Sequence, residues 1–293
     1  MKVLLTGASG QLGRELAYSR PQGVNLVAVT SAQLDIADAS QVDAILAEVA
    51  PQIILNAAAY TAVDRAEAEE ARALEVNATG VANLSIAARR LGSRLIHVST
   101  DFVFDGGGAT PYRPADATGP VSAYGRTKLA GERSALETLG DRATVIRTSW
   151  LYSAHGRNFV ATMLDLMADR EALQVVDDQT GSPTWAALLA RCLWRMSSRP
   201  DLHGLWHWAD GGSCTWFEFA RSIQSLALER GLLDLEIPIE AVTTAEFPTP
   251  AARPGYSVLD TSATYDALDL EPVPWRDALG RMLDEMRERA ASR

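Results

Sequence analysis

Three side chains in the middle of the sequence could together protonate the oxygen of a carbonyl group. Thr100 ends an apolar segment that predicts a β-strand, and Tyr124 and Lys128 follow in a segment that predicts a helix. Residues four apart on a helix share one face, so the Lys128 ammonium can lie near the Tyr124 phenol. A nearby cation favours the phenolate and lowers the pKa of a tyrosine from its reference of about 10. With the Thr100 hydroxyl bonded to the same carbonyl oxygen, the set has the chemistry of a proton donor.

A Tyr-x-x-x-Lys pair alone is common on helix surfaces, so its meaning depends on a second motif near the N-terminus. Gly7, Gly10 and Gly13 lie between a predicted strand and a predicted helix, with the spacing G-x-x-G-x-x-G. In a dinucleotide-binding turn, such glycines permit the tight turn, the approach of the pyrophosphate and the close packing of helix on strand. The helix N-terminus offers free N–H groups and partial positive charge to the phosphates. The two motifs together indicate a nicotinamide-dependent reductase.

The position that distinguishes NADH from NADPH carries no decisive residue. An acidic residue about 20 positions after the glycines often binds the ribose 2′-hydroxyl of NAD. Thr30 and Ser31 occupy that place, and neither repels nor firmly binds a 2′-phosphate. Asp35 and Ile36 come later, where they could meet the adenine ring. The choice between the two cofactors therefore stays open.

Apolar runs of strand length alternate with helical segments through the first half of the chain, as in a parallel sheet covered on both faces. This alternation predicts an α/β fold with a doubly wound parallel Rossmann sheet, whose carboxyl edge borders the ligand crevice. The small residues of Asn56–Tyr60 would let a flat ring lie close to the backbone at that edge. We expect strands at 3–5, 26–29, 53–55, 95–98 and 144–146, and helices at 12–17, 41–49, 67–90 and 124–139.

The alternation loosens after about Trp150, where Trp, Pro and Gly become more frequent. We therefore expect a dinucleotide-binding domain over residues 1–150 and a smaller mixed substrate-binding lobe over residues 151–293, some of whose segments return to the first domain. Helical periodicity is present in this lobe at 159–167, 186–196 and 217–228.

The composition excludes several classes of partner. With 37 acidic and 27 basic residues, the formal net charge of −10 argues against a surface that binds nucleic acid or an anionic membrane. No stretch approaches the roughly 18 to 20 apolar residues that span a bilayer, and no signal-peptide core is found. Cys192 and Cys214 lie in unlike contexts and are expected to be free thiols. We expect a cytoplasmic protein.

The four histidines do not predict a metal site. His203 and His207 are four positions apart, but they flank an aromatic strand at 205–208, where side chains alternate and helical phase does not apply. His97 lies in the fourth predicted strand and is interpreted as a satisfied core residue. No metal ligand is expected from these residues.

The chain resembles the dTDP-4-dehydrorhamnose reductases, a family of extended short-chain dehydrogenase/reductases. In similar sugar dehydratases an Asp-Glu pair follows the threonine of the fourth strand, whereas here Asp101 is followed by Phe102, which favours reduction over elimination. Epimerases of this class usually have small residues there. The resemblance implies NAD(P)H-dependent reduction of dTDP-4-dehydro-L-rhamnose to dTDP-L-rhamnose. It rests on motifs that run in order from residue 6 to residue 254: TGASGQLG, NAAAYTAVDRAE, EVNATG, STDFVFDG, YGRTKLAGE, RTSWLY, NFVATML, VVDDQTGSPT and PTPAARP.

The resemblance also implies roles for individual residues beside the catalytic set of Tyr124, Lys128 and Thr100. The expected substrate-binding residues are Thr100, Asp101, Tyr124, Trp150 and Arg253, the last because a guanidinium fits phosphate oxygens. Some relatives hold Mg²⁺ between subunits, for which Glu15 is a candidate and a salt-bridged glutamate is the alternative. A homodimer is equally implied. The expected cofactor-binding residues are Gly7, Gly10, Gln11, Leu12, Gly13, Asp35, Ile36, Ala57, Ala58, Ala59, Tyr60, Thr61, Val98, Tyr124 and Lys128.

Two alternatives stay open at this point. One is a reductase or epimerase that acts on another nucleotide sugar, because the motifs define the chemistry better than the sugar. The other is a non-catalytic regulatory subunit resembling that of methionine adenosyltransferase, which shares this scaffold. The joint presence of the threonine, tyrosine and lysine favours an enzyme.

Overall fold

The computed structural model describes residues 1–291, and its centre is a sheet of six parallel strands. The strand order is β10-β5-β4-β3-β1-β2. β1 has β2 on one side and β3 on the other, so the direction of winding reverses at β1, as in a doubly wound fold. The five strands expected in the first half of the chain and the aromatic strand at 205–208 are all confirmed. The six strands of the sheet are β1 (Lys2–Thr6), β2 (Asn25–Val29), β3 (Ile53–Asn56), β4 (Arg94–Thr100), β5 (Ala143–Thr148) and β10 (Gly204–Trp208).

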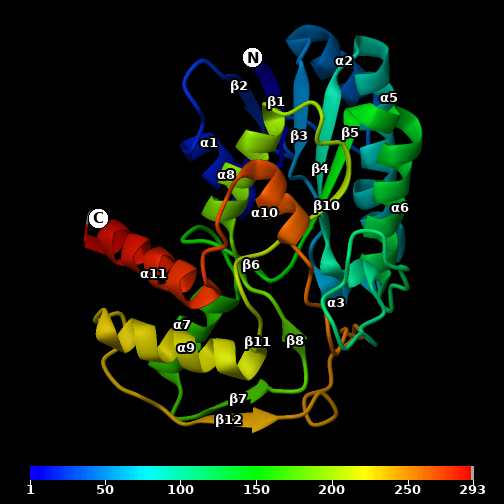
Figure 1. Ribbon diagram of the computed structural model, residues 1–293. Helices are drawn as coiled ribbons and strands as arrows, with labels where there is room; N and C mark the ends of the chain where they lie inside the picture. The colour runs from blue at the N-terminus through cyan, green and yellow to red at the C-terminus, as the bar shows by residue number, and fades with distance from the viewer. Residues whose placement is uncertain (292–293) are drawn as a thin grey trace.

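Helices cover both faces of the sheet (Figure 1). Because successive strand side chains point to opposite faces, Leu4 packs into one helical layer and Leu5 into the other, so a strand such as β1 has consecutive buried apolar residues. The predicted α/β Rossmann fold is confirmed. None of the helices within residues 1–291 is long and apolar enough to cross a membrane. One layer holds α2 (Ala39–Val49), α5 (Gly80–Leu91) and α6 (Ala123–Leu139), and the other holds α1 (Gln11–Tyr18), α8 (Ala186–Ser197) and α10 (Ser262–Leu268).

The helix predicted at 67–90 is confirmed for most of its length, but it begins three residues later and consists of α4 (Glu70–Leu74), a π-helical turn at Glu75–Thr79 and then α5, with the short α3 (Val63–Ala66) before it. The turn buries Asn77. Its side-chain oxygen accepts a hydrogen bond from the Tyr60 amide at 2.8 Å, and its Nδ2 donates to the Thr127 hydroxyl at 3.1 Å. The irregular turn therefore ties the segment after β3 to α6, a role that π turns often have near functional sites.

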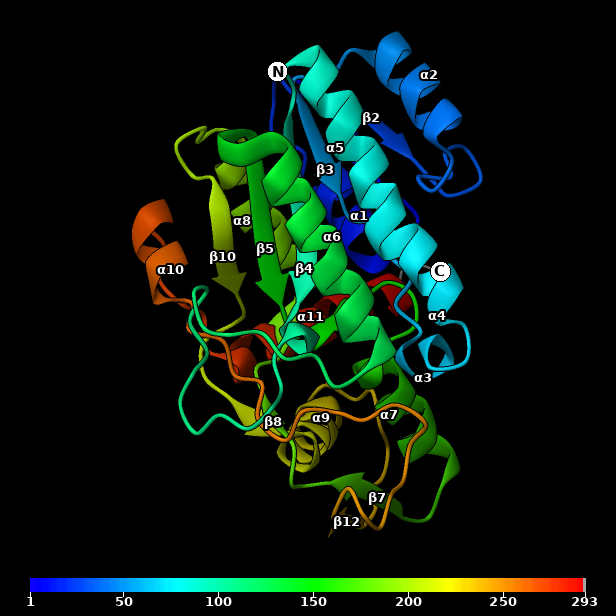
Figure 2. The same cartoon turned by 90° about the vertical axis from the view of Figure 1, so that its right-hand side faces the viewer.

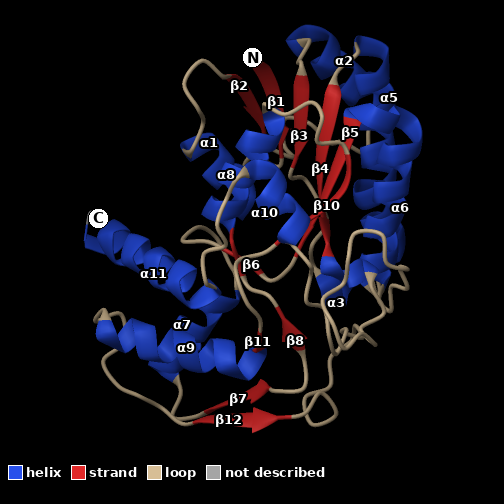
Figure 3. Cartoon of the chain, in the orientation of Figure 1, coloured by secondary structure: helices blue, strands red, loops and turns tan. Residues whose placement is uncertain are grey.

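The second half of the chain forms a smaller lobe below the carboxyl edge of the sheet (Figure 3). Tyr152, Phe219 and Met282 belong to its separate apolar core. Three segments return to the sheet domain: β10 pairs with β5, as Figure 2 shows, α8 packs on α1, and α10 packs on β10. The lobe contains α7 (Phe159–Asp169), α9 (Trp216–Glu229), α11 (Trp275–Ala291) and the strand pairs β6 (Leu151–Tyr152) with β9 (Thr184–Trp185), β7 (Leu173–Val176) with β12 (Ile239–Val242), and β8 (Thr180–Gly181) with β11 (Cys214–Thr215).

Candidate active site

The glycine-rich loop connects β1 to α1 at the point where the winding of the sheet reverses. Gly7 has a φ of +73°, and a Cβ placed on it would lie 2.6 Å from the Ala57 carbonyl carbon. A Cβ on Gly13 would lie 2.2 Å from the Gly7 oxygen. The helix cap is Gly10, which has no side chain to occupy the first amides of α1. The loop is thus as tightly packed as a dinucleotide turn requires, and its helix N-terminus can receive a phosphate.

A cavity of about 470 Å³ opens beside this loop. Asp35 and Ile36 lie on its wall, together with Ser31 at the end of the second strand. Arg72, which sequence reasoning missed, also lines it and lies 3.5 Å from the Asp35 carboxylate. No spacing in the sequence connects Arg72 with Asp35, because the two belong to different crossover segments. Of the predicted residues, this cavity gathers Gly7, Gly10, Asp35, Ile36, Ala57, Ala58, Ala59 and Tyr60.

A second cavity, of about 570 Å³, adjoins the first, and Gly10, Ala57 and Ala59 line both. The structure therefore places every predicted site residue on the wall of one of two neighbouring cavities. Phe102, Asn158 and Trp216 line the second cavity as well and were not predicted. The predicted residues on its wall include Gln11, Leu12, Gly13, Thr61, Val98, Thr100, Asp101, Tyr124, Lys128, Trp150 and Arg253.

Thr100, Asp101 and Tyr124 form a buried polar group at the end of β4. The Thr100 hydroxyl donates to the Asp101 carboxylate at 3.0 Å, and the second Asp101 oxygen has no hydrogen-bond partner within the described chain. Burial raises the pKa of Asp101 to about 6, although the nearby hydroxyls of Ser257 and Thr100 oppose the shift. Burial also raises the pKa of Tyr124 to about 12; the Thr100 hydrogen bond lowers it, and the charge of Asp101 raises it.

The Lys128 side chain is buried, and its Nζ donates to the Val98 carbonyl at 2.7 Å. Burial lowers the pKa of Lys128 to about 8, and the charge of Glu132 partly opposes this shift. The expectation that Lys128 lowers the pKa of Tyr124 is therefore wrong for this structure. The physical reason is that removal of the phenol from water outweighs the other influences on it.

At the lobe side of the second cavity, Trp150 stacks on Trp216 with ring centroids 3.5 Å apart and planes 9° apart. Trp150 has a φ of +46°, which is unfavourable for a bulky residue and persists only where packing imposes it. That packing includes Gly181, where a Cβ would lie 2.5 Å from the indole. Arg253 donates to the Asp64 carboxylate at 2.9 Å, so its guanidinium is held at the cavity wall.

Two of the missed residues carry a local signal that could have found them. Asn158 caps α7 by accepting from the Ala161 amide at 3.0 Å, as an Asn before an apolar helix suggests. Trp216 begins α9 directly after its N-cap residue Thr215, which forms a capping box with Glu218. These signals predict where each helix begins, but not that the residue faces a cavity.

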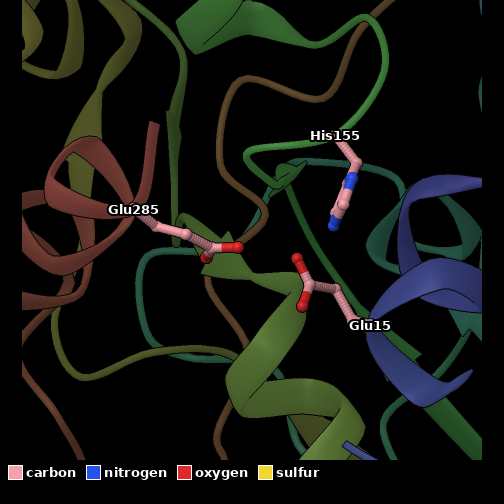
Figure 4. Close-up of side chains that lie close together, drawn as sticks. All are labelled: Glu15, His155 and Glu285. Atoms are coloured by element: carbon pink, nitrogen blue, oxygen red, sulfur yellow. The ribbon is translucent and has the colours of Figure 1, made fainter. Parts of the chain in front are cut away.

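Glu15, His155 and Glu285 point toward one another away from these cavities, with ligand atoms within 4.8 Å (Figure 4). Arg289 donates to Glu285 at 2.6 Å and to His155 at 2.7 Å, so a guanidinium already supplies the positive charge. Mg²⁺ prefers about six oxygen ligands, whereas this cluster offers two carboxylates and an imidazole. One chain therefore offers about half of the usual ligand number, and the Mg²⁺ ion between subunits that the resemblance allowed stays a prediction.

The structure combines a Rossmann sheet, a glycine-rich turn where its winding reverses, and a Thr, a Tyr and a Lys at the adjoining cavity. This combination defines a nicotinamide-dependent extended short-chain dehydrogenase/reductase. The family model described as RmlD substrate binding domain matches residues 1–288. The dTDP-4-dehydrorhamnose reductase of Salmonella typhimurium is 40% identical and covers 98% of both chains, and that of Streptomyces griseus is 43% identical over 94% of this chain and 91% of the relative. The chain belongs to the dTDP-4-dehydrorhamnose reductase family.

A solved structure agrees with this assignment. The dTDP-4-dehydrorhamnose reductase of Bacillus anthracis, in complex with NADP, matches with a TM-score of 0.91 at 37% identity. The match covers 97% of this chain and 99% of that one. The relatives named here are reductases, which supports an enzyme rather than the regulatory-subunit alternative.

Proposed function

We propose that this protein reduces dTDP-4-dehydro-L-rhamnose to dTDP-L-rhamnose with NADPH or NADH. The observation that carries the proposal is the position of Thr100, Tyr124 and Lys128 on one cavity wall, next to the glycine-rich loop. The family and the NADP-bound relative support the choice of substrate and cofactor. The cavities could hold the dinucleotide across the glycine loop and the sugar below the end of β4.

Tyr124 is the proposed proton donor. Because the pKa of Tyr124 is raised to about 12, the phenol keeps its proton at neutral pH and can give it to an alkoxide, which is a stronger base. When bound, a nicotinamide cofactor would supply the hydride for carbon 4. Tyr124 would protonate the oxygen that then holds the carbonyl electron pair. Thr100 would orient that oxygen by a hydrogen bond, and Lys128 would hold the nicotinamide ribose.

The residues on the lobe side are proposed to bind the rest of the substrate. Trp150 offers an indole face already held by Trp216, and such a face suits a sugar ring. Arg253 offers a guanidinium to the diphosphate of the substrate. The Asp64 carboxylate holds this guanidinium in place before the substrate binds. We further propose residues 1–150 as the dinucleotide-binding domain and most of residues 151–293 as the substrate lobe. The homodimer and the cytoplasmic location stay predictions, and sedimentation of the purified protein tests the first.

Oxidation of NADPH and NADH, followed at the nicotinamide absorbance, tests the proposal. The substrate is generated in place by the upstream dehydratase and epimerase, and the product is identified as dTDP-rhamnose. Tyr124→Phe should lower kcat by about 10²- to 10⁴-fold, as expected for loss of a positioned acid. Tyr18→Phe is the matched control, because that ring is 83% exposed and should leave turnover unchanged.

Near-full turnover by Tyr124→Phe would overturn the role of the phenol. Absence of oxidation by folded wild-type protein that binds the dinucleotide would favour another nucleotide sugar, and next the regulatory alternative.

A further inference from the structure

A line of buried hydrogen bonds runs under the active-site lysine, from β1 through β3 to β4. The Thr6 hydroxyl donates to the Asn56 side-chain oxygen at 2.6 Å, and Asn56 Nδ2 lies 3.0 Å from His97 Nδ1. The other imidazole nitrogen, His97 Nε2, lies 3.4 Å from Lys128 Nζ. All four side chains are at most 1% exposed, so each polar atom depends on its protein neighbours.

The orientation of the Asn56 amide is fixed by its neighbours. The Ala58 backbone N–H points at one terminal atom of the Asn56 side chain, at 3.1 Å. A backbone N–H can only donate, so that atom must be the oxygen, and the Thr6 hydroxyl donates to the same oxygen. The remaining atom, Nδ2, is therefore an N–H donor directed at His97.

This orientation decides the tautomer of His97. A neutral imidazole has one N–H and one acceptor nitrogen, and Nδ1 must accept because it faces the Asn56 donor. The proton therefore resides on Nε2, the atom that faces Lys128. A doubly protonated ring is disfavoured, because burial and the charge of Lys128 lower the pKa of His97 well below its ordinary value.

We propose that His97 is a positioning residue that directs an N–H at the Lys128 nitrogen and thereby favours its neutral amine over its ammonium. A neutral amine has a lone pair that accepts from His97, and one of its own hydrogens goes to the Val98 carbonyl. An ammonium has only donors, so it gains nothing from His97 Nε2–H. The orientation of the Asn56 amide on β3 is in this way transmitted through His97 on β4 to the lysine on α6.

The other charged groups around Lys128 do not account for this preference. Glu132, one turn along α6, favours the ammonium, but its carboxylate is bonded to Arg147 of β5 at 2.7 Å. Tyr124, on the same helix, and Asp101, at the end of β4, line the same cavity. Burial lowers the pKa of Lys128 to about 8 against the charge of Glu132, and the proposed His97 N–H acts in the same direction as burial.

This inference deepens the proposed function and, for its chemical consequence, rests on it. After Tyr124 has given its proton to the alkoxide, the phenolate must be reprotonated. Transfer of a proton from Lys128, with a pKa of about 8, to the phenolate of Tyr124, with a pKa of about 12, is more favourable than transfer from an ordinary lysine, with a pKa of about 10.4. His97 would thus help Lys128 to return the proton that Tyr124 loses.

The chain offers an unusually direct measurement, because Lys2 and Lys128 are its only lysines. Protein labelled with [ε-¹³C]lysine gives two NMR signals, and Lys2, which is half-buried at the start of β1, serves as the internal reference. The pH titration of the Lys128 signal then reports its protonation without cofactor or substrate. Long-range ¹H–¹⁵N spectra of the four histidines report the tautomer of His97, whose signal is identified by its loss in His97→Leu.

Two variants test the direction of the effect. Asn56→Asp replaces the donor with an acceptor, so His97 should carry its proton on Nδ1 and present an acceptor to the ammonium. His97→Leu removes the N–H without adding charge. We expect the Lys128 midpoint to rise by about one pH unit or more in both variants. His207→Leu is the control, because it removes another fully buried imidazole, on β10 and bonded to the Tyr112 carbonyl, and should leave the midpoint unchanged.

A wild-type His97 with its proton on Nδ1 would overturn the inference by itself, even if no variant folds. An unchanged Lys128 midpoint in both Asn56→Asp and His97→Leu would overturn it as well. Because these measurements use the free protein, a wrong substrate assignment leaves them unaffected. Failure of the inference is therefore distinguishable from failure of the proposed function.

Discussion

Substitution of Glu132 by glutamine should destabilise the protein far more than the same exchange at its surface. Glu132 and Arg147 form a two-point ion pair with distances of 2.9 and 2.7 Å, and their side chains are only 1% and 2% exposed. Arg147 also donates to the Pro114 carbonyl at 3.2 Å. Removal of one charge from such a pair leaves the other buried without compensation, which costs about 3–5 kcal/mol. We expect about 3 kcal/mol for Glu132→Gln, because the amide oxygen retains one hydrogen bond.

The assay is equilibrium unfolding in urea, followed by the fluorescence of the seven tryptophans. Glu70→Gln is the matched control: Glu70 pairs with Arg126 in the same two-point geometry, but both side chains are 45% exposed. Exposed pairs contribute about 0–1 kcal/mol, so the control should change the free energy of unfolding by no more than that.

The double variant Glu132→Leu with Arg147→Met separates charge from packing. Since it removes both buried charges, it should recover most of the stability that Glu132→Gln loses. Equal losses for Glu132→Gln and Glu70→Gln would refute the reasoning, because they would show that burial does not set the cost. A double variant less stable than Glu132→Gln would show that the ion pair does more than neutralise two buried charges, and that it adds stability to the fold.

Three further outcomes are expected. Gly13→Ala should weaken NADPH binding at least about tenfold in a nicotinamide fluorescence titration, because the new Cβ would lie 2.2 Å from the Gly7 oxygen. Gly107→Ala is the control and should bind normally, because its Cβ would lie 3.8 Å from the nearest atoms, the Asp105 carboxylate oxygens. Arg253→Ala should raise the KM for the nucleotide sugar roughly 10- to 100-fold, as loss of a charge-assisted hydrogen bond predicts, and equal effects on the KM for NADPH would contradict this role. Burial raises the pKa of Asp101 to about 6, above its unfolded value, so the protein loses stability as the pH rises from about 4 to 6. Asp101→Asn should therefore gain up to about 3 kcal/mol relative to wild type at pH 7.5 but not at pH 4, and a gain independent of pH would refute this cause.

The sequence by itself determined the sheet and much of the candidate site. The strands are apolar runs because both faces of the sheet are covered, and such runs are visible without any knowledge of the fold. Gly7 needs a positive φ and Gly13 needs close contact, requirements that glycine spacing reveals. Tyr124 and Lys128 share a helix face by their spacing alone. These features depend on neighbours in the chain, so residue order encodes them.

The tertiary structure alone decided the contacts that cross the sheet and join the lobes. Trp216 meets Trp150, and Arg72 meets Asp35, only because distant segments pack together. The electrostatics of the site followed the same rule: the sequence predicted a lowered pKa for Tyr124, whereas burial raises it. His97, interpreted from the sequence as a core residue, lies opposite Asn56 because β3 and β4 pair in one particular register, and it faces Lys128 because α6 packs on β4. Desolvation and contact across strands depend on which elements pack together, and no local spacing records that.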